Sequence, residues 1–150
     1  MNAGFYKNIL FCTDFSANAD RAFDFAIETA RCHQGCALTL LHVLPEPEAQ
    51  FWKTYLYEIE GVDQKAKADI DAKIDAAYRP RIPEGIAFRA DFRIGNPAQA
   101  IVDYATENHC DLIVLGRQGT GSIFFGNVAT RVARHAHCPV LIIPVENQAR

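Results

Sequence analysis

A glycine-rich segment in the last third of the chain offers the clearest binding chemistry in the sequence. It follows the apolar run Leu112 to Leu115 and precedes a helical pattern that leads to a second apolar run, Val140 to Ile143. Glycine lets the backbone turn tightly and aim its N–H groups outward, as an anion requires at a helix N-terminus. The segment therefore predicts a site for a small phosphorylated ligand. Its glycines are Gly116, Gly119, Gly121 and Gly126.

A second interpretation of these glycines stays open. Gly119 and Gly121 make only a tight turn in it, and Gly126 with Asn127 only starts the next helix. No phosphate is then involved. Asp14 also has two interpretations, because a carboxylate just after a strand can contact a ligand or can cap the following helix beside Ser16.

The elements that must position this segment alternate between short apolar runs and helical patterns. Nearly continuous apolar runs predict strands buried on both faces, whereas alternating ones predict a strand at a sheet edge. The predicted strands are Asn8 to Thr13, Ala37 to Val43, Ile86 to Ile94 at an edge, Leu112 to Leu115 and Val140 to Ile143. The predicted helices start after Ser16, cover Phe51 to Tyr78 with a break near Gly61, run from Asn96 and Pro97 to Asn108, and follow Gly126 and Asn127.

This alternation predicts an α/β fold with a five-stranded parallel sheet and helices on both faces, because parallel neighbours need a crossover helix between them. In such sheets a ligand binds beyond the carboxyl ends of the strands, where the strand order reverses. The loops after the first and fourth strands are therefore the candidate site. We expect a core that contains Ile9, Leu10, Phe11, Ile113, Val114 and Leu141.

Composition limits the class of protein. A length of 150 residues, 49% of them hydrophobic, fits one domain over residues 1–150. The net charge of −3, with 15 basic residues scattered among 18 acidic ones, gives no footprint for nucleic acid. No apolar run approaches the ~18 residues that span a bilayer, so we expect no membrane partner and a cytoplasmic location. Cys32 and Cys36 flank His33 without zinc-site spacing, and no metal site is predicted.

Motifs in order along nearly the whole chain resemble the universal stress protein family. They are Ile9 to Ser16, Leu41-His42-Val43, Gly95-Asn96-Pro97, Asp111 to Gly116 and Cys138 to Pro144. The resemblance implies the flavodoxin-like, or adenine nucleotide alpha hydrolase-like, strand order 3-2-1-4-5. It also implies a homodimer formed through the last strand, Val140 to Val145.

The resemblance further implies that the chain binds ATP or a related adenine nucleotide, with no metal beyond a Mg²⁺ carried by the nucleotide. Asp14 then corresponds to the family residue that contacts the base or ribose. The full set of binding residues implied is Thr13, Asp14, Val43, Gly116, Gly119, Gly126, Asn127 and Val128.

The chain departs from the family's nucleotide-binding motif, G-2x-G-9x-G-(S/T). Only six residues, Thr120 to Phe125, separate Gly119 from Gly126, and Asn127 replaces the Ser or Thr. Three missing residues shorten an extended chain by ~10 Å, which is enough to move one wall of a phosphate pocket. Asn127 can still cap a helix and offer its amide N–H₂ to an oxyanion.

Three functional hypotheses follow. The first is a dimeric stress-response regulator that senses an adenine nucleotide between Asp14 and the segment from Gly116 to Asn127. The second is a nucleotide-free dimeric module that docks an unknown protein partner. The third is a weak nucleotide hydrolase, for which the sequence supplies no catalytic residue or local catalytic signature.

Overall fold

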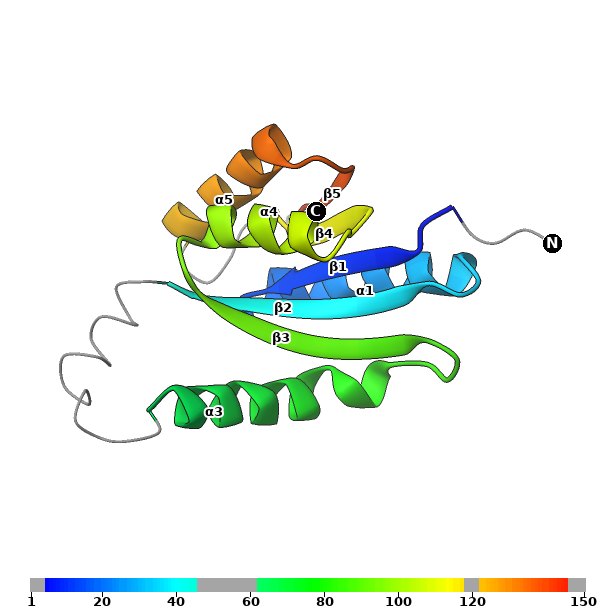
Figure 1. The fold of residues 1–150 in the computed structure, drawn as a ribbon, viewed down its shortest axis with the longest axis horizontal. Helices are drawn as coiled ribbons and strands as arrows, with labels where there is room; N and C mark the ends of the chain where they lie inside the picture. The colour runs from blue at the N-terminus through cyan, green and yellow to red at the C-terminus, as the bar shows by residue number, and fades with distance from the viewer. Residues whose placement is uncertain (1–4, 46–61, 118–121, 146–150) are drawn as a thin grey trace, which may run out of the picture.

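The computed structural model describes residues 5–45, 62–117 and 122–145, with only the backbone described for 62–66 and 122–127. Five strands form one sheet: β1 (Asn8–Thr13), β2 (Ala37–Pro45), β3 (Ala87–Gly95), β4 (Leu112–Gly116) and β5 (Val140–Ile143). All the pairs are parallel and the strand order is β3-β2-β1-β4-β5 (Figure 1). The predicted fold class and strand order are confirmed.

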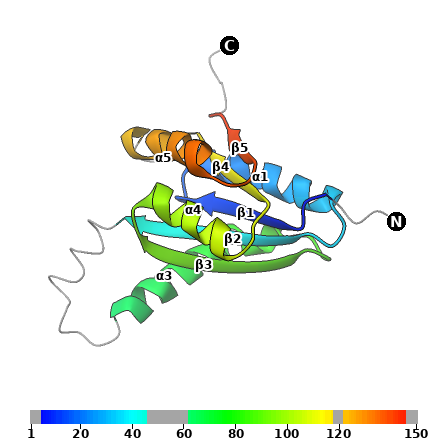
Figure 2. The same cartoon turned by 45° about the horizontal axis from the view of Figure 1, so that its top comes forward.

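Helices cover both faces of the sheet. The helical elements are α1 (Ala17–Cys32), α3 (Val62–Ala77), the 3₁₀ turn η1 (Arg79–Arg81), α4 (Pro97–Glu107) and α5 (Ser122–His135). On one face α1 and α3 pack against the core around Phe11 and Leu40, and on the other α4 and α5 pack around Leu10 and Leu41 (Figure 2). Within the described residues no helix is long and apolar enough to cross a membrane.

Local capping signals set two of the helix starts. The Ser16 side chain accepts a hydrogen bond from the Ala19 N–H at 3.1 Å, so Ser16 is the N-cap of α1. The Asn96 side chain does the same for Gln99 at 3.0 Å, ahead of Pro97 in the first turn of α4. Both caps satisfy a backbone donor that the helix itself leaves without a partner, and both agree with the sequence prediction.

The centre of the sheet carries most of the predicted core, with one error. Ile9, Leu10, Phe11, Ile113 and Val114 are 0% exposed, as expected for two adjacent central strands. Leu141 is 36% exposed, so its place in the predicted core is wrong. The reason is topological, because β5 is the edge strand and Leu141 lies one strand beyond Val114, its partner on β4.

Several predicted boundaries differ from the structure, and those of β3 and β4 do so by one residue. β2 continues two residues beyond Val43 to Pro45, because it stays paired with β3 along its whole length. Of the long predicted helix, residues 51–61 lie outside the described residues, and α3 covers Val62–Ala77. α5 begins at Ser122, so Gly126 and Asn127 do not start it.

Candidate functional site at the carboxyl ends of the strands

The sheet brings several of the predicted binding residues to one edge. Thr13 ends β1, Asp14 follows it, Val43 lies near the end of β2 and Gly116 ends β4. Because β1 is paired in parallel with β2 on one side and with β4 on the other, the carboxyl ends of these strands meet. This is the point where the strand order reverses, at which ligands bind in open parallel sheets.

The remaining predicted residues follow β4. Gly119 lies outside the described residues, whereas Gly126, Asn127 and Val128 lie inside α5. Since α5 starts at Ser122, these three residues come after its first turn, where backbone N–H groups are bonded within the helix. The prediction that Asn127 caps this helix is therefore wrong. The backbone donors without an intrahelical partner belong to the first turn, at Ser122 to Phe124.

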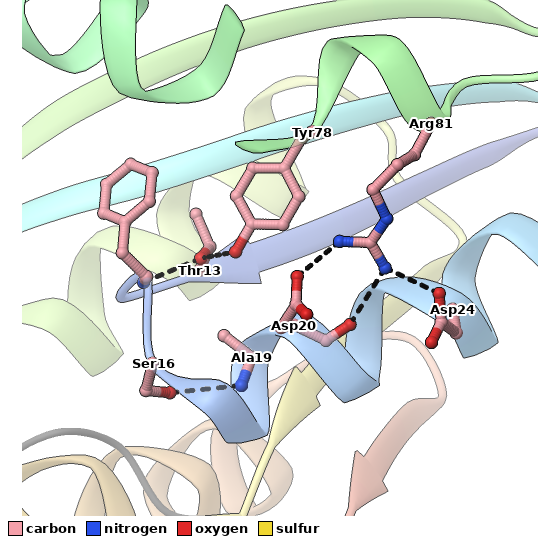
Figure 3. A network of polar contacts seen from close by, with 8 residues as sticks. Thr13, Ser16, Ala19, Asp20, Asp24, Tyr78 and Arg81 are labelled. Atoms are coloured by element: carbon pink, nitrogen blue, oxygen red, sulfur yellow. Dashed lines mark hydrogen bonds and ion pairs between the residues drawn. The ribbon is translucent and has the colours of Figure 1, made fainter. Parts of the chain in front are cut away.

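The loop after β1 is held by short hydrogen bonds from its own side chains. The Phe15 N–H donates to Thr13 Oγ1 at 2.8 Å (Figure 3). The Ser16 N–H donates to Asp14 Oδ1 at 3.0 Å. The N-cap of α1 is Ser16, so Asp14 does not cap this helix. The Asp14 carboxylate instead accepts the Ser16 N–H and forms a turn just before the helix. The Asp14 side chain is half-buried at the end of β1.

Phe15 takes a backbone conformation that a large L residue rarely adopts, with φ at +64°. Its ring lies 4.8 Å from the His42 ring and 6.0 Å from the Tyr78 ring, centroid to centroid. Lys73 Nζ lies 5.3 Å from the Phe15 ring centroid, and His42 Nδ1 donates to the Thr13 carbonyl at 2.9 Å. Strain of this kind persists only where the surrounding contacts enforce it, and it concentrates at functional sites.

Sequence reasoning missed Asn18, which lies in the first turn of α1 and packs against Gly116 at the end of β4. Its side chain is buried, and its Nδ2 donates to the carbonyls of Ile143 at 3.1 Å and Pro144 at 3.3 Å. It therefore ties the start of α1 to the end of β5. A Cβ on Gly116 would lie 2.7 Å from Asn18 Oδ1, so the glycine is required here for the close approach of α1 to β4. The available signal in the sequence was that Asn18, a polar residue, lies directly before Ala19, the first apolar position of the predicted helix.

Sequence reasoning also missed Tyr78, which it assigned only to the end of a helix. Its side chain is 1% exposed, and its hydroxyl lies 2.6 Å from Thr13 Oγ1. Burial raises the pKa of Tyr78 to about 12. Asp20 and Asp14 also raise this pKa, whereas the hydrogen bond to Thr13 and the charge of Arg81 lower it. The hydroxyl therefore keeps its proton at neutral pH.

Substituting Gly116 tests the close approach of α1 to β4. We expect Gly116→Ala to lower the free energy of unfolding by about 1–3 kcal/mol, because the added methyl group overlaps a side chain that two hydrogen bonds hold in place. Urea unfolding followed by circular dichroism measures this. Asn18→Ala removes the overlapping atoms, so the two substitutions together should cost less than the sum of the single ones. Additive costs would show that the overlap is absent.

Alkaline pH tests the burial of the Tyr78 hydroxyl. An unfolded tyrosine ionises near pH 10, whereas folded Tyr78 keeps its proton up to about 12. Its contribution to stability is thus complete below pH 10 and is lost as pH rises toward 12, by about 1.4 kcal/mol per pH unit. Denaturant titrations at stepped pH should give a shallower decline for Tyr78→Phe than for the wild type. Equal slopes would contradict the burial.

Comparisons with known proteins agree with this architecture. The sequence profile of the universal stress protein family matches residues 5–144. Universal stress protein MJ0531 of Methanocaldococcus jannaschii is 44% identical over 92% of this chain and 82% of its own length. Universal stress protein Sll1654 of Synechocystis is 32% identical over 93% of this chain and 86% of its own.

A solved structure extends the likeness to three dimensions. The universal stress protein UspA from Lactobacillus plantarum superposes with a TM-score of 0.74 at 32% identity, over 95% of this chain and 99% of that one. The family profile, the relatives and the shared fold agree over nearly the whole sequence. The chain belongs to the universal stress protein family.

Proposed function

We propose that this chain is a stress-response regulator that binds ATP or a related adenine nucleotide at the carboxyl edge of the sheet and acts as a homodimer. The observation that carries the proposal is the pairing of β1 with β4. It sets the loop after β1 beside Gly116 and the path to α5. The loop after β1, which is strained at Phe15 and held by several hydrogen bonds, and the N-terminus of α5 thus lie at the same carboxyl edge of the sheet.

The nucleoside end of the proposed site belongs to β1 and β2. Thr13 is buried and fixes the loop, Asp14 is half-buried at the strand end, and Val43 is half-buried against the core under α4 and α5. A carboxylate in this place can accept hydrogen bonds from ribose hydroxyls or a base amino group. An aliphatic side chain on the neighbouring strand provides an apolar contact for the base.

The phosphate end belongs to the connection from Gly116 to α5 and includes Gly119. The first turn of α5 supplies backbone N–H donors and the positive end of the helix dipole, which together favour a phosphate. This shifts the proposed backbone contacts from Gly126 and Val128 to Ser122, Ile123 and Phe124, and it retains Asn127 for its side-chain amide. In the proposed complex a Mg²⁺ ion is carried by the phosphates. Among the described residues there is no group of three or more His, Cys, Asp or Glu side chains that could hold a metal ion.

Nucleotide complexes are known for other proteins of this fold. One is a universal stress protein in complex with cAMP, at 24% identity and a TM-score of 0.59, and another is an Arabidopsis thaliana family protein with AMP bound, at 18% and 0.56. At these identities the likeness concerns the fold alone. The support for a nucleotide in this chain therefore comes from its own loop residues.

A nucleotide-free docking module is the second candidate function. The shortened spacing between Gly119 and Gly126 favours it, because the structure places Gly126 within α5 and not in the connecting loop. The two functions differ in whether the first turn of α5 has an anion to bind.

Calorimetric titration with ATP tests nucleotide binding directly. We expect one nucleotide per chain and a rise in melting temperature. Asn127→Ala should weaken binding about fivefold, which corresponds to about 1 kcal/mol for one lost hydrogen bond. Asp14→Ala should chiefly reduce the discrimination between ATP and other nucleoside triphosphates. Asp103→Ala, on the exposed face of α4, is the matched control and should bind as the wild type does.

An absence of heat and of thermal stabilisation with millimolar ATP would overturn the nucleotide proposal. The docking-module function would then replace it.

The proposed dimer forms through β5. Among the described residues no strand pairs with its outer edge, and Leu141 and Val145 are 36% and 41% exposed there. The Ile113 and Arg117 N–H groups donate to the carbonyls of Pro139 and Ile143. Because bonding direction alternates along a parallel strand, the backbone groups of Val140 and Ile142 point away from β4. An isologous pairing of two such edges closes a two-fold dimer.

Removing one edge donor should dissociate this dimer. Ile142→Pro deletes an outward N–H group while it leaves the bonds to β4 in place. We expect sedimentation velocity at micromolar concentration to show a dimer for the wild type and for Ile142→Val, and a folded monomer for Ile142→Pro. A wild-type monomer, or a dimer that survives Ile142→Pro, would exclude this interface.

A further inference from the structure

Tyr78 occupies an unusual place for a residue that links two helical segments. It lies between α3 and η1, yet its ring is buried beneath the end of β1. The ring centroid is 4.7 Å from that of Phe23 on α1 and 5.5 Å from that of Phe11 on β1. The aromatic packing therefore places the Tyr78 hydroxyl at the strand end from which the candidate site is built.

Two consecutive hydrogen bonds connect this hydroxyl to the strained loop. It lies 2.6 Å from Thr13 Oγ1, and the same oxygen accepts the Phe15 N–H at 2.8 Å (Figure 3). Phe15 is the residue with φ at +64°. The Tyr78 hydroxyl thus fixes the rotamer of the side chain that holds the strained residue, and Asp14 lies between the two bonded positions.

Arg81 fixes Tyr78 from the side of α1. Its guanidinium binds the carboxylates of Asp20 and Asp24, the latter at 2.6 Å (Figure 3). The same group lies 4.7 Å from the Phe23 ring centroid and 6.0 Å from that of Tyr78. The turn η1, which follows Tyr78, is therefore anchored to α1, the helix that begins at the loop. The Tyr78 hydroxyl thus has little freedom to leave Thr13.

We propose that Tyr78 is a positioning residue for the nucleoside end of the site, which sets the place of Asp14 through Thr13 and Phe15 without touching the nucleotide. The inference rests on the proposed nucleotide binding and names a residue outside the sequence motif. The same contacts couple the end of α3 to the site, because a ligand that orders the loop after β1 also favours the position in which the Tyr78 hydroxyl contacts Thr13. By linkage, nucleotide binding then stabilises the end of α3.

A pair of tyrosine substitutions tests the proposal. Tyr78→Phe keeps the buried ring and removes only the hydroxyl. Tyr104→Phe is the matched control, because Tyr104 is also 1% exposed and its hydroxyl accepts a hydrogen bond from Arg89 on the other face of the sheet. We expect Tyr78→Phe to weaken ATP binding about fivefold to tenfold and Tyr104→Phe to change it less than about twofold.

Hydrogen exchange in the absence of nucleotide supplies a second measurement, which a purely structural role would not move selectively. The Phe15 and Ser16 amides should exchange faster in Tyr78→Phe and unchanged in Tyr104→Phe. In a Thr13→Val background, Tyr78→Phe should have no further effect on affinity, because its connection to the loop is already missing. ATP should slow exchange at the Tyr78 amide, which donates to the Ile74 carbonyl at 2.9 Å.

The outcomes separate this inference from the proposed function. Wild-type affinity in Tyr78→Phe overturns the positioning role and leaves nucleotide binding intact. Weaker binding with unchanged exchange at Phe15 and Ser16 also overturns it, because the effect then does not act through the loop. If the wild type binds no ATP, the proposed function fails together with the nucleoside role. Hydrogen exchange at the Phe15 and Ser16 amides, compared between Tyr78→Phe and the wild type, then decides separately whether the Tyr78 hydroxyl orders the loop.

Discussion

The parallel pairing of β1 with β2 on one side and with β4 on the other is the constraint on which this structure depends. It makes β1 the central strand, with Ile9, Leu10 and Phe11 fully buried. It also sends the chain to opposite sides of the sheet on either side of β1, so that α1 and α3 cover one face and α4 and α5 cover the other. The carboxyl edge at β1 and β4 is where these two halves meet, and the candidate site follows from that position alone.

Features with a local cause could be predicted from the sequence. The strand order came from the family resemblance, and the alternation of apolar runs independently predicted parallel strands. Ser16 and Asn96 were identified as caps, because a capping side chain acts within three residues of itself. The start of α5 was missed, because the glycine and asparagine at 126 and 127 have low helix propensity and read as a boundary. Leu141 is exposed because β5 is the edge strand, and an apolar run alone does not show how far the covering helices extend over a sheet edge.

Features with a distant cause could not be predicted in the same way. Gly116 was correctly placed at the end of β4, but its freedom was attributed to a phosphate, whereas the structure shows the buried Asn18 side chain against it. Tyr78 meets Thr13 across 65 positions of sequence. A single sequence carries no signal for such a pair, since the two hydroxyls are neighbours only in the folded chain, where the Tyr78 ring packs against Phe11 of β1. The sequence therefore indicated Thr13, Asp14 and Ser16, which hold the loop, but it did not indicate Tyr78, which contacts Thr13 from a distant part of the chain.

The two sides of the candidate site are built in different ways, and this difference bears on how a ligand would act. The loop after β1 is fixed before any ligand arrives, by hydrogen bonds at Thr13, Asp14 and Ser16 and by aromatic packing on Phe15. Preorganisation of this kind lowers the entropic cost of binding and favours selectivity for one nucleoside. On the other side, the donors are the first-turn amides of α5, whose attraction for an anion is general and does not distinguish one phosphate from another. Under the proposed function, nucleoside choice resides in the loop after β1 and in its support from Tyr78, while the first turn of α5 decides whether a phosphate is held at all.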